Sequence, residues 1–392
     1  MALPGLRSTN DMGTDGRPMN WRAGLSLLSP REHKAPLFAL TSKMAKESTD
    51  DPQFHWWEEE VDMLTLSVNG AVASTSTTTV TIDQYGTRLK VGDIFLNQNT
   101  NEHLRVQSVT SDTVVEFTRG FAGSTAVNIG DNNVLVYIGS AFREGAPVAT
   151  GTSFNPTKYY NYTQIFRDPI EWTRTATKTR LRYTTDIMKE DRRRAAHKHA
   201  MGIERALWLG RRWESTEAGQ PIRTTGGLIS HIHADNIQAV QGGGGALDAD
   251  ELFSYFPRMF AYGSSEKLAF ASIGVLTIIG ELVRKNGNMQ IGPMEKEFGM
   301  DVRRVTHAAG TLVLTEHPLM GRSSGFLPDS LVVLDTNGWK FRYITDTTLL
   351  KDRQAAGTDG MTEEYLTECG CEFPHGKKHF QLTGILSAGL DA

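Results

Sequence analysis

The feature that most constrains the fold is a long, charged segment at residues 184–213, which contains the stretch KEDRRRAAHKHAMGIERALWLGRR. Four apolar residues recur in it at i, i+4, i+7 and i+11: Ala196, Ala200, Ile203 and Leu207. This spacing predicts an α-helix with one narrow stripe of small residues, which a neighbouring element can approach closely. Thr185 or Asp186 can cap its start, and Gly210 weakens its end.

The charged circumference of this helix raises the question of nucleic-acid binding. Its basic face is predicted at Arg192, Arg193, Arg194, Lys198 and Arg205. Residues 192–194 span most of a helical turn, so they cannot form one line along a phosphate backbone. Glu190, Asp191 and Glu204 are close enough to pair with some of these cations. The chain's formal charge of -4 also gives no global basic field. A solvated or interface-pairing face is favoured, and nucleic-acid binding through 189–212 stays open.

Residues 64–140 have a different character, rich in Thr, Ser, Val and Gly and without a helical period. Five short runs with β-branched or alternating apolar residues are predicted strands: 78–82, 93–97, 103–109, 113–117 and 133–138. Turn residues separate them. The spacing predicts a small antiparallel barrel or sandwich.

The segments on either side of this region carry bulky groups but little core. Residues 1–53 are rich in proline and read as an extended arm, and residues 158–176 read as one long strand that Pro169 restricts to a sheet edge or a break. Large side chains of these segments need cover, because exposed aromatic surface is costly. On the arm they are Phe38, Phe54, Trp56 and Trp57, and on the strand Tyr160, Tyr162, Phe166, Arg167 and Trp172.

The last 170 or so residues alternate between helical and strand patterns. Asp248 with Glu251 resembles a capping box that opens a helix, and residues 274–287 predict a second helix. Buried strands are predicted at 267–272, 311–316, 330–336 and 339–344. These patterns predict a mixed α/β domain with its own core. With 392 residues, 39% of them hydrophobic, the chain is long enough for two or three domains.

None of the candidate metal ligands completes a site. Three histidine pairs and one cysteine pair lie close in the sequence: His197 and His199, His231 and His233, His375 and His379, and Cys369 and Cys371. The first pair points to different sides of a helix, and no acidic or cysteine cluster completes the others. The cysteines are expected to be buried free thiols. We expect no metal and no other cofactor.

The sequence also lacks the patterns of common enzymes and of membrane or secreted proteins. The glycines at 242–245 are followed by Asp248 and not by the lysine of a phosphate loop. No nucleophile motif or paired carboxylates stand out, so no enzyme is predicted. The start of the chain has no signal-peptide core, and the apolar run 273–283 is too short to cross a bilayer. A soluble, non-secreted protein is expected.

The order of these parts resembles the major capsid proteins of tailed double-stranded DNA phages, which have the Hong Kong 97-like fold. It is similar in particular to the group with a β-domain inserted in the extended loop. The stretches that carry the resemblance are FHWWEEE, LKVGDIFLNQNTNEHLRVQSV through FTRGFAGSTA, NYTQIFRDPIEWTRTA, and GIERALWLGRR followed by RTTGGLISHI. They cover nearly the whole chain.

The resemblance implies an α+β fold with a fixed division of labour. It implies an N-terminal arm at 1–60, an extended loop at 61–176 with a β insert at about 64–140, a peripheral domain with its spine helix at 177–225, an axial domain at 226–334 and a return to the peripheral domain at 335–392. The arm and loop would contact neighbouring subunits through the large side chains named above. No coiled-coil scaffolding segment and no cross-linking motif are seen.

The function implied is a non-catalytic major capsid protein. Hexamers and pentamers of it would form an icosahedral phage head. The head would be assembled in the host bacterial cytoplasm and would become the capsid of the virion. Further expected partners are a portal, a scaffold, decoration or minor capsid proteins, and packaged double-stranded DNA by nonspecific proximity, with no membrane. Two alternatives stay open: a nucleic-acid-binding protein that uses 189–212, and a carbohydrate-active enzyme with the β insert as its binding module.

Overall fold

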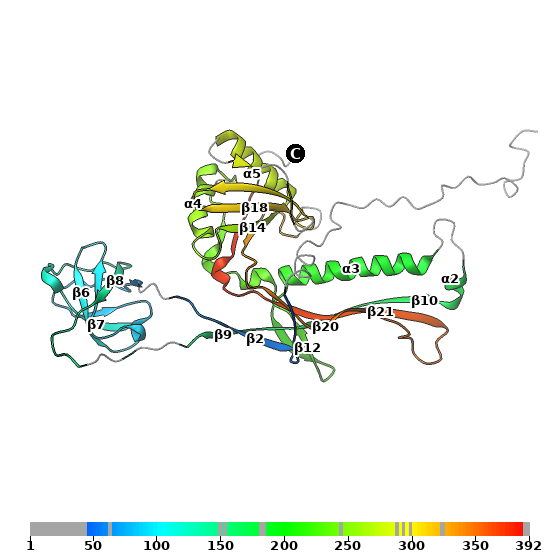
Figure 1. The fold of residues 1–392 in the computed structure, drawn as a ribbon, viewed down its shortest axis with the longest axis horizontal. Helices are drawn as coiled ribbons and strands as arrows, with labels where there is room; N and C mark the ends of the chain where they lie inside the picture. The colour runs from blue at the N-terminus through cyan, green and yellow to red at the C-terminus, as the bar shows by residue number, and fades with distance from the viewer. Residues whose placement is uncertain are drawn as a thin grey trace, which may run out of the picture. The chain divides into compact units, whose positions relative to one another are not determined.

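The computed structural model describes residues 45–61, 65–147, 151, 155–179, 186–242, 246–286, 290–291, 295–297, 300–321 and 326–386. The chain divides into two compact units. One unit comprises Met1–Trp56 with Tyr159–Ala392, and the other is Trp57–Lys158. Each unit is described separately below (Figure 1).

The Trp57–Lys158 unit is an antiparallel barrel. Its strands are β3 (Thr65–Ser67), β4 (Thr79–Thr81), β5 (Asp93–Asn97), β6 (His103–Val109), β7 (Val114–Thr118) and β8 (Val134–Ser140), in the order β3-β8-β5-β6-β7-β4. An antiparallel bridge between Val68 and Ile82 joins the two ends of this order and closes the sheet. The predicted barrel is thus confirmed. The sequence patterns missed β3, which is three residues long.

The core of the barrel consists of the inward-facing residues of these strands. Phe95, Val106, Val115 and Phe117 are fully buried, and the rings of Phe95 and Phe117 meet edge to face at 6.1 Å. The alternation of buried and half-exposed residues along β5 and β7 is the period-two pattern on which the prediction rested.

The larger unit contains a long four-stranded sheet in the order β1-β20-β21-β10. Its strands are β1 (Lys46–Ser48), β20 (Lys340–Leu350), β21 (Gly360–Glu372) and β10 (Gln164–Thr173). Pro169 lies in the edge strand β10, as predicted, because proline cannot donate to a second neighbouring strand.

The prediction of a single strand at 158–176 is wrong in two places. It divides at Thr163 into β9 (Thr157–Tyr162) and β10, because β9 pairs with β2 (Gln53–Glu58) instead of joining the four-stranded sheet. The Thr163 N–H donates to the Pro52 carbonyl at 2.8 Å at this point. The strand ends at Thr173, whose hydroxyl caps the short helix α2 (Arg174–Lys178) by accepting from the Ala176 N–H.

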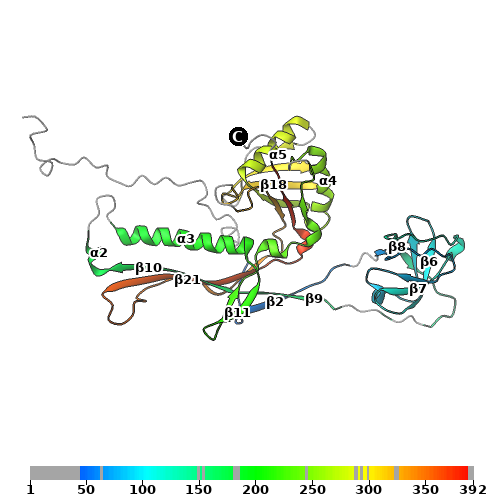
Figure 2. The same cartoon turned by 180° about the vertical axis from the view of Figure 1, so that it is seen from behind.

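The predicted long helix is α3 (Ile187–Leu209), which lies along β10 and β21 in both views (Figures 1 and 2). The Asp186 carboxylate caps it by accepting from the Lys189 N–H, and the helix ends at Gly210, as predicted. A Cβ at Gly210 would collide with the carbonyl oxygens of Ala206 and Thr225. The exposed hairpin of β11 (Trp213–Glu217) and β12 (Gln220–Thr224) follows.

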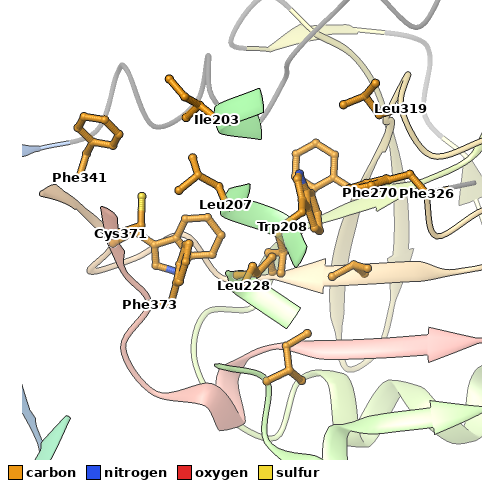
Figure 3. Close-up of a cluster of buried hydrophobic side chains, with 14 of the residues drawn as sticks. Ile203, Leu207, Trp208, Leu228, Phe270, Leu319, Phe326, Phe341, Cys371 and Phe373 are labelled. Atoms are coloured by element: carbon orange, nitrogen blue, oxygen red, sulfur yellow. The ribbon is translucent and has the colours of Figure 1, made fainter. Parts of the chain in front are cut away.

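The C-terminal half of α3 is held by a hydrophobic cluster (Figure 3). Ile203, Leu207 and Trp208 are fully buried in it, and the Trp208 ring meets the Phe270 ring edge to face at 5.5 Å. Ile203 and Leu207 belong to the predicted apolar stripe, whereas Ala196 and Ala200 are half-buried. The stripe therefore faces the core where its residues are large.

An α/β body completes the larger unit. Its eight-stranded sheet runs β13 (Ile237–Ala239), β22 (Phe380–Thr383), β19 (Leu331–Leu334), β14 (Glu266–Ala271), β18 (Gly310–Glu316), β17 (Met300–His307) and β15 (Gln290–Ile291), with β16 (Glu295–Glu297) also on β17. Helices α4 (Ala249–Met259) and α5 (Ile273–Asn286) belong to the same body. Residues 335–386 contribute to both sheets, since β20 and β21 belong to the four-stranded sheet and β22 to the eight-stranded one.

One of the two hydrogen bonds of the predicted capping box at the start of α4 is present. The Asp248 carboxylate caps the helix by accepting from the Ala249 N–H at 2.7 Å. Glu251 does not close the reciprocal bond, because its Oε1 accepts from the Gln241 N–H at 2.6 Å and the Tyr255 hydroxyl at 2.9 Å. Glu251 thus ties the helix to the segment that precedes it.

Candidate assembly surfaces

The large side chains at the end of the arm differ sharply in exposure. Phe54 and Trp56 are buried by their own chain, at 4% and 9% exposure, whereas Trp57 is 64% exposed. Strand alternation causes this difference, because successive side chains of β2 point to opposite faces. Phe38 lies outside the described residues. Of the four predicted arm contacts, Trp57 is the described residue that presents a large apolar surface.

The burial of Phe54 depends on a glycine in the four-stranded sheet. A Cβ at Gly370 of β21 would lie 2.9 Å from the Phe54 ring and 2.7 Å from the Tyr162 carbonyl oxygen. Trp56 packs beside them against Tyr159 and His231, with ring centroids 6.3 and 6.1 Å away. These contacts hold the end of the arm on its own subunit.

Tyr160 and Tyr162 of β9 are half-buried and are bonded to residues at and after the end of α3. Arg212 donates to the Tyr160 carbonyl at 2.8 Å, and its guanidinium lies 4.0 Å from the centre of the Tyr160 ring. The Tyr162 hydroxyl donates to Glu214 at 3.1 Å. Desolvation and this hydrogen bond to a carboxylate raise the pKa of Tyr162. The neighbouring hairpin thus holds these two half-buried tyrosines in place.

The residues of β10 alternate between the helix and the opposite face. Phe166 and Trp172 are buried at 9% and 6% exposure, and the Trp172 Nε1–H donates to Asp191 of α3 at 2.9 Å. Arg167 points to the other face and bonds Glu364 through two donors, both at 2.8 Å. Ile165, which the sequence reasoning did not select, lies on that face and is 58% exposed. Period-two alternation with Phe166 could have identified it.

The cations of α3 also occupy different sides of the helix. Arg192 points inward and bonds Glu363 of β21 through two donors, both at 2.6 Å. The others are exposed, and three of them have acidic neighbours: Arg193 with Glu190 at 3.0 Å, Arg194 with Asp191 at 3.9 Å and Lys198 with Asp168 at 2.8 Å. Arg205 is exposed as well. The predicted partners Glu190 and Asp191 are thus confirmed.

The predicted role of Glu204 as a partner of these cations is wrong. Glu204 is fully buried and accepts from the Trp208 Nε1–H at 3.1 Å and from His317 Nε2 at 2.8 Å. His317 Nδ1 accepts from the Leu319 N–H, so the tautomer with a proton on Nε2 fits this network. Glu204 lies one turn before Trp208, on the side of α3 that faces the core.

The remaining histidine and cysteine candidates have structural surroundings. His199 is buried between Asp168 and Thr367, at 2.9 and 2.7 Å. Cys369 and Cys371 are buried free thiols, as predicted, and burial raises the pKa of both. No group of three His, Cys, Asp or Glu residues suited to a metal ion is found within the described part of the chain. A membrane-crossing helix is likewise not found among the described residues.

The parts of the molecule occur in the order that the resemblance to Hong Kong 97-like capsid proteins implied. A two-stranded ribbon, formed by β2 and β9, and the barrel inserted between these strands precede the long helix. The α/β body and the strands β20 and β21 follow it. These features define the class of protein, a subunit that forms a shell.

Comparison with known proteins gives the family. The family described as SU10 major capsid protein matches residues 8–386, so the chain belongs to this family. It is 27% identical over 330 residues to the major capsid protein of Pseudomonas phage PaMx41, which covers 82% of this chain and 78% of that protein. The predicted recognition, Hong Kong 97-like fold and role as a phage major capsid protein are confirmed.

Solved structures with a similar course of the chain include two from phages. A structure from Mycobacterium phage Bobi has a TM-score of 0.48 at 10% identity and covers 96% of this chain and 98% of that chain. The capsid of Myoviridae phage XM1 has a TM-score of 0.45 at 9% identity and covers 97% of this chain and 100% of that chain. Membership of the major capsid protein family makes the protein part of a virion and indicates a structural role.

Proposed function

We propose that this chain assembles as hexamers and pentamers into an icosahedral head that encloses double-stranded DNA. Assembly takes place in the host bacterial cytoplasm, on a separate scaffold protein and around a portal, and decoration or minor capsid proteins are added to the shell. Membership of a major capsid protein family is the observation that carries the proposal.

The exposed or half-buried side chains of the ribbon formed by β2 and β9, and of the adjacent edge strand β10, are proposed as contacts between subunits. They are Trp57, Tyr160, Tyr162, Ile165 and Arg167. Burying one large apolar side chain contributes about 1.5–3 kcal/mol, so a few such contacts per subunit suffice when symmetry repeats them. Phe54, Trp56, Phe166 and Trp172 support these contacts indirectly, because they fix the ribbon and β10 on their own subunit. Phe38 remains a prediction.

The test combines size-exclusion chromatography with electron microscopy of the expressed full-length chain. Wild-type protein is expected to form closed shells with five-fold and six-fold clusters. Trp57→Ala is expected to leave the circular-dichroism spectrum unchanged and to reduce the yield of shells, because it removes a 64% exposed contact without touching the core. Val91→Ala, which shortens a 52% exposed apolar side chain of the barrel unit, is the matched control.

Three outcomes would count against the proposal or part of it. Wild-type protein that stays a monomer and binds DNA in a salt-sensitive way would favour the nucleic-acid-binding alternative instead. An unchanged yield of shells from Trp57→Ala would remove Trp57 from the set of contacts between subunits. Hydrolysis of a glycan by the purified chain would favour the carbohydrate-active alternative.

A further inference from the structure

Three exposed cations of α3 form a line that the consecutive arginines alone do not suggest. Arg194, Lys198 and Arg205 are spaced i, i+4 and i+11. At about 100° per residue they fall within about 40° of the helix circumference, and they extend over about 16 Å of its axis. We call these three residues the basic line.

The basic line is held facing away from the core. His199, Ile203 and Leu207 anchor the other sides of the helix and are 2%, 0% and 0% exposed. The side chains of Arg194 and Lys198 are 52% and 80% exposed, and Arg205 is exposed as well. The packing of α3 therefore fixes which cations face outward.

The acidic neighbours of the basic line also bond other donors. Glu190, one turn before Arg194 and 37% exposed, bonds Arg193 at 3.0 Å. Asp168, whose side chain is 17% exposed, accepts from His199 at 2.9 Å as well as from Lys198. Asp191, 30% exposed, accepts from the Trp172 indole at 2.9 Å, and its 3.9 Å separation from Arg194 exceeds hydrogen-bond length. The acids thus neutralise the line only in part, and the outermost layer is positive.

The surroundings of the basic line favour a phosphate backbone over another protein surface. Between Arg194 and Arg205 no large apolar side chain of α3 is exposed, and Leu209, 50% exposed, lies beyond the line at the last residue of the helix. The centre of a protein interface requires apolar surface along its length. Gly202 is the exposed residue between Lys198 and Arg205. Phosphate contacts need only cations in reach and carry no sequence information. The line is also a local concentration of positive charge in a chain whose formal charge is -4.

We propose that the basic line of α3 is the surface of the shell subunit that contacts the phosphates of packaged duplex DNA. The proposal rests on the proposed function, in which the shell encloses double-stranded DNA. The contact is nonspecific and depends on ionic strength. Arg192, bound to Glu363, takes no part in it.

The test measures binding of the full-length, unassembled subunit to a fluorescent DNA duplex of mixed sequence over a series of NaCl concentrations. The triple variant Arg194→Gln, Lys198→Gln, Arg205→Gln is compared with Arg143→Gln, Lys158→Gln, Lys351→Gln, which removes the same charge from exposed cations elsewhere. Each lost phosphate contact reduces the slope of log K against log salt by about 1, so the first variant is expected to reduce it by about 2–3 and the control by much less. Arg194→Lys with Arg205→Lys should retain the wild-type slope.

Several results would overturn the proposal. They are an unchanged slope in the triple variant, an equal reduction in the control, and a loss of shells with wild-type DNA binding, which would assign the line to an acidic protein surface. Circular dichroism of each variant verifies that α3 is folded. Closed shells from wild-type protein, seen by electron microscopy, would support the proposed function whatever slope is measured. The absence of shells would overturn the proposed function instead.

Discussion

Arg192 and Arg193 of α3 are adjacent in the sequence but have different partners. Arg192 reaches Glu363, whose side chain is 2% exposed, and this carboxylate raises the pKa of Arg192. Arg193 is 62% exposed and bonds Glu190 on its own helix. A buried carboxylate that loses its cation retains an unpaired charge, whereas an exposed pair is largely replaced by water. The direction of each side chain therefore decides its contribution to stability.

We predict that Arg192→Ala lowers the free energy of unfolding by about 2–4 kcal/mol, because it leaves the Glu363 carboxylate buried and unpaired. Arg193→Ala, the matched control, should change it by less than about 1 kcal/mol. Urea denaturation of the unassembled subunit, followed by circular dichroism, measures both values. Equal effects of the two substitutions would show that the Glu363 pair does not support the helix.

At the scale of the elements, the barrel is organised around one buried ion pair. Glu102, directly before β6, is fully buried and accepts from Arg119 Nε and Nη2 at 2.8 and 2.9 Å. The N–H groups of Gly120 and Val127 donate to the same carboxylate at 3.0 and 3.2 Å. Desolvation raises the pKa of Glu102, but these hydrogen bonds outweigh it and leave the pKa below its usual 4.5. The pair fixes the long β7–β8 connection on the barrel.

The lowered pKa of Glu102 predicts acid sensitivity of the barrel. Its contribution to stability is fully present above pH 4.5, the usual pKa, and is lost as the pH falls through the lower folded-state pKa. Glu102→Gln should therefore destabilise the barrel at neutral pH by about 2–4 kcal/mol, and the difference from wild type should shrink in acid. Thermal unfolding of both proteins over a pH series measures it, and a difference that stays constant would contradict the assignment.

The whole molecule consists of two units with separate cores. The hydrophobic cluster of the barrel consists of buried residues between 66 and 135. One cluster of the larger unit joins the long helix to the α/β body, and the other lies within the α/β body. The α-helices among the described residues, α2 to α5, all belong to the larger unit. The chain leaves for the barrel through β2 and returns through β9, and these two strands pair with each other. The strands β2 and β9 can therefore pair with each other in the absence of the barrel.

We predict that replacing residues 61–155 with a short Gly/Ser linker preserves the helical circular-dichroism signal of the larger unit. The remaining β2 and β9 keep their pairing, and neither core of the larger unit loses a residue. Residues 65–140 expressed alone should give a β-type spectrum with a cooperative thermal transition. Loss of the helical signal in the deletion variant would mean that the two units do not fold independently.

The sequence by itself determined the features that depend on neighbours within a few residues. The Asp186 cap, the end of α3 at Gly210, the strands β5 and β6 and the edge position of Pro169 all follow from local spacing and backbone chemistry. The order of such elements also carried the resemblance to a capsid protein.

Only the tertiary structure decided which side chains are covered. Arg192 meets Glu363 across 171 residues and Glu204 meets His317 across 113, and no local pattern in the sequence encodes either pairing. Trp56 and Trp57 are both large, apolar and adjacent, but packing of Tyr159 and His231 on one face of β2 buries the first and leaves the second exposed. Burial depends on what the rest of the chain places against a residue, and that placement arises from contacts between distant segments.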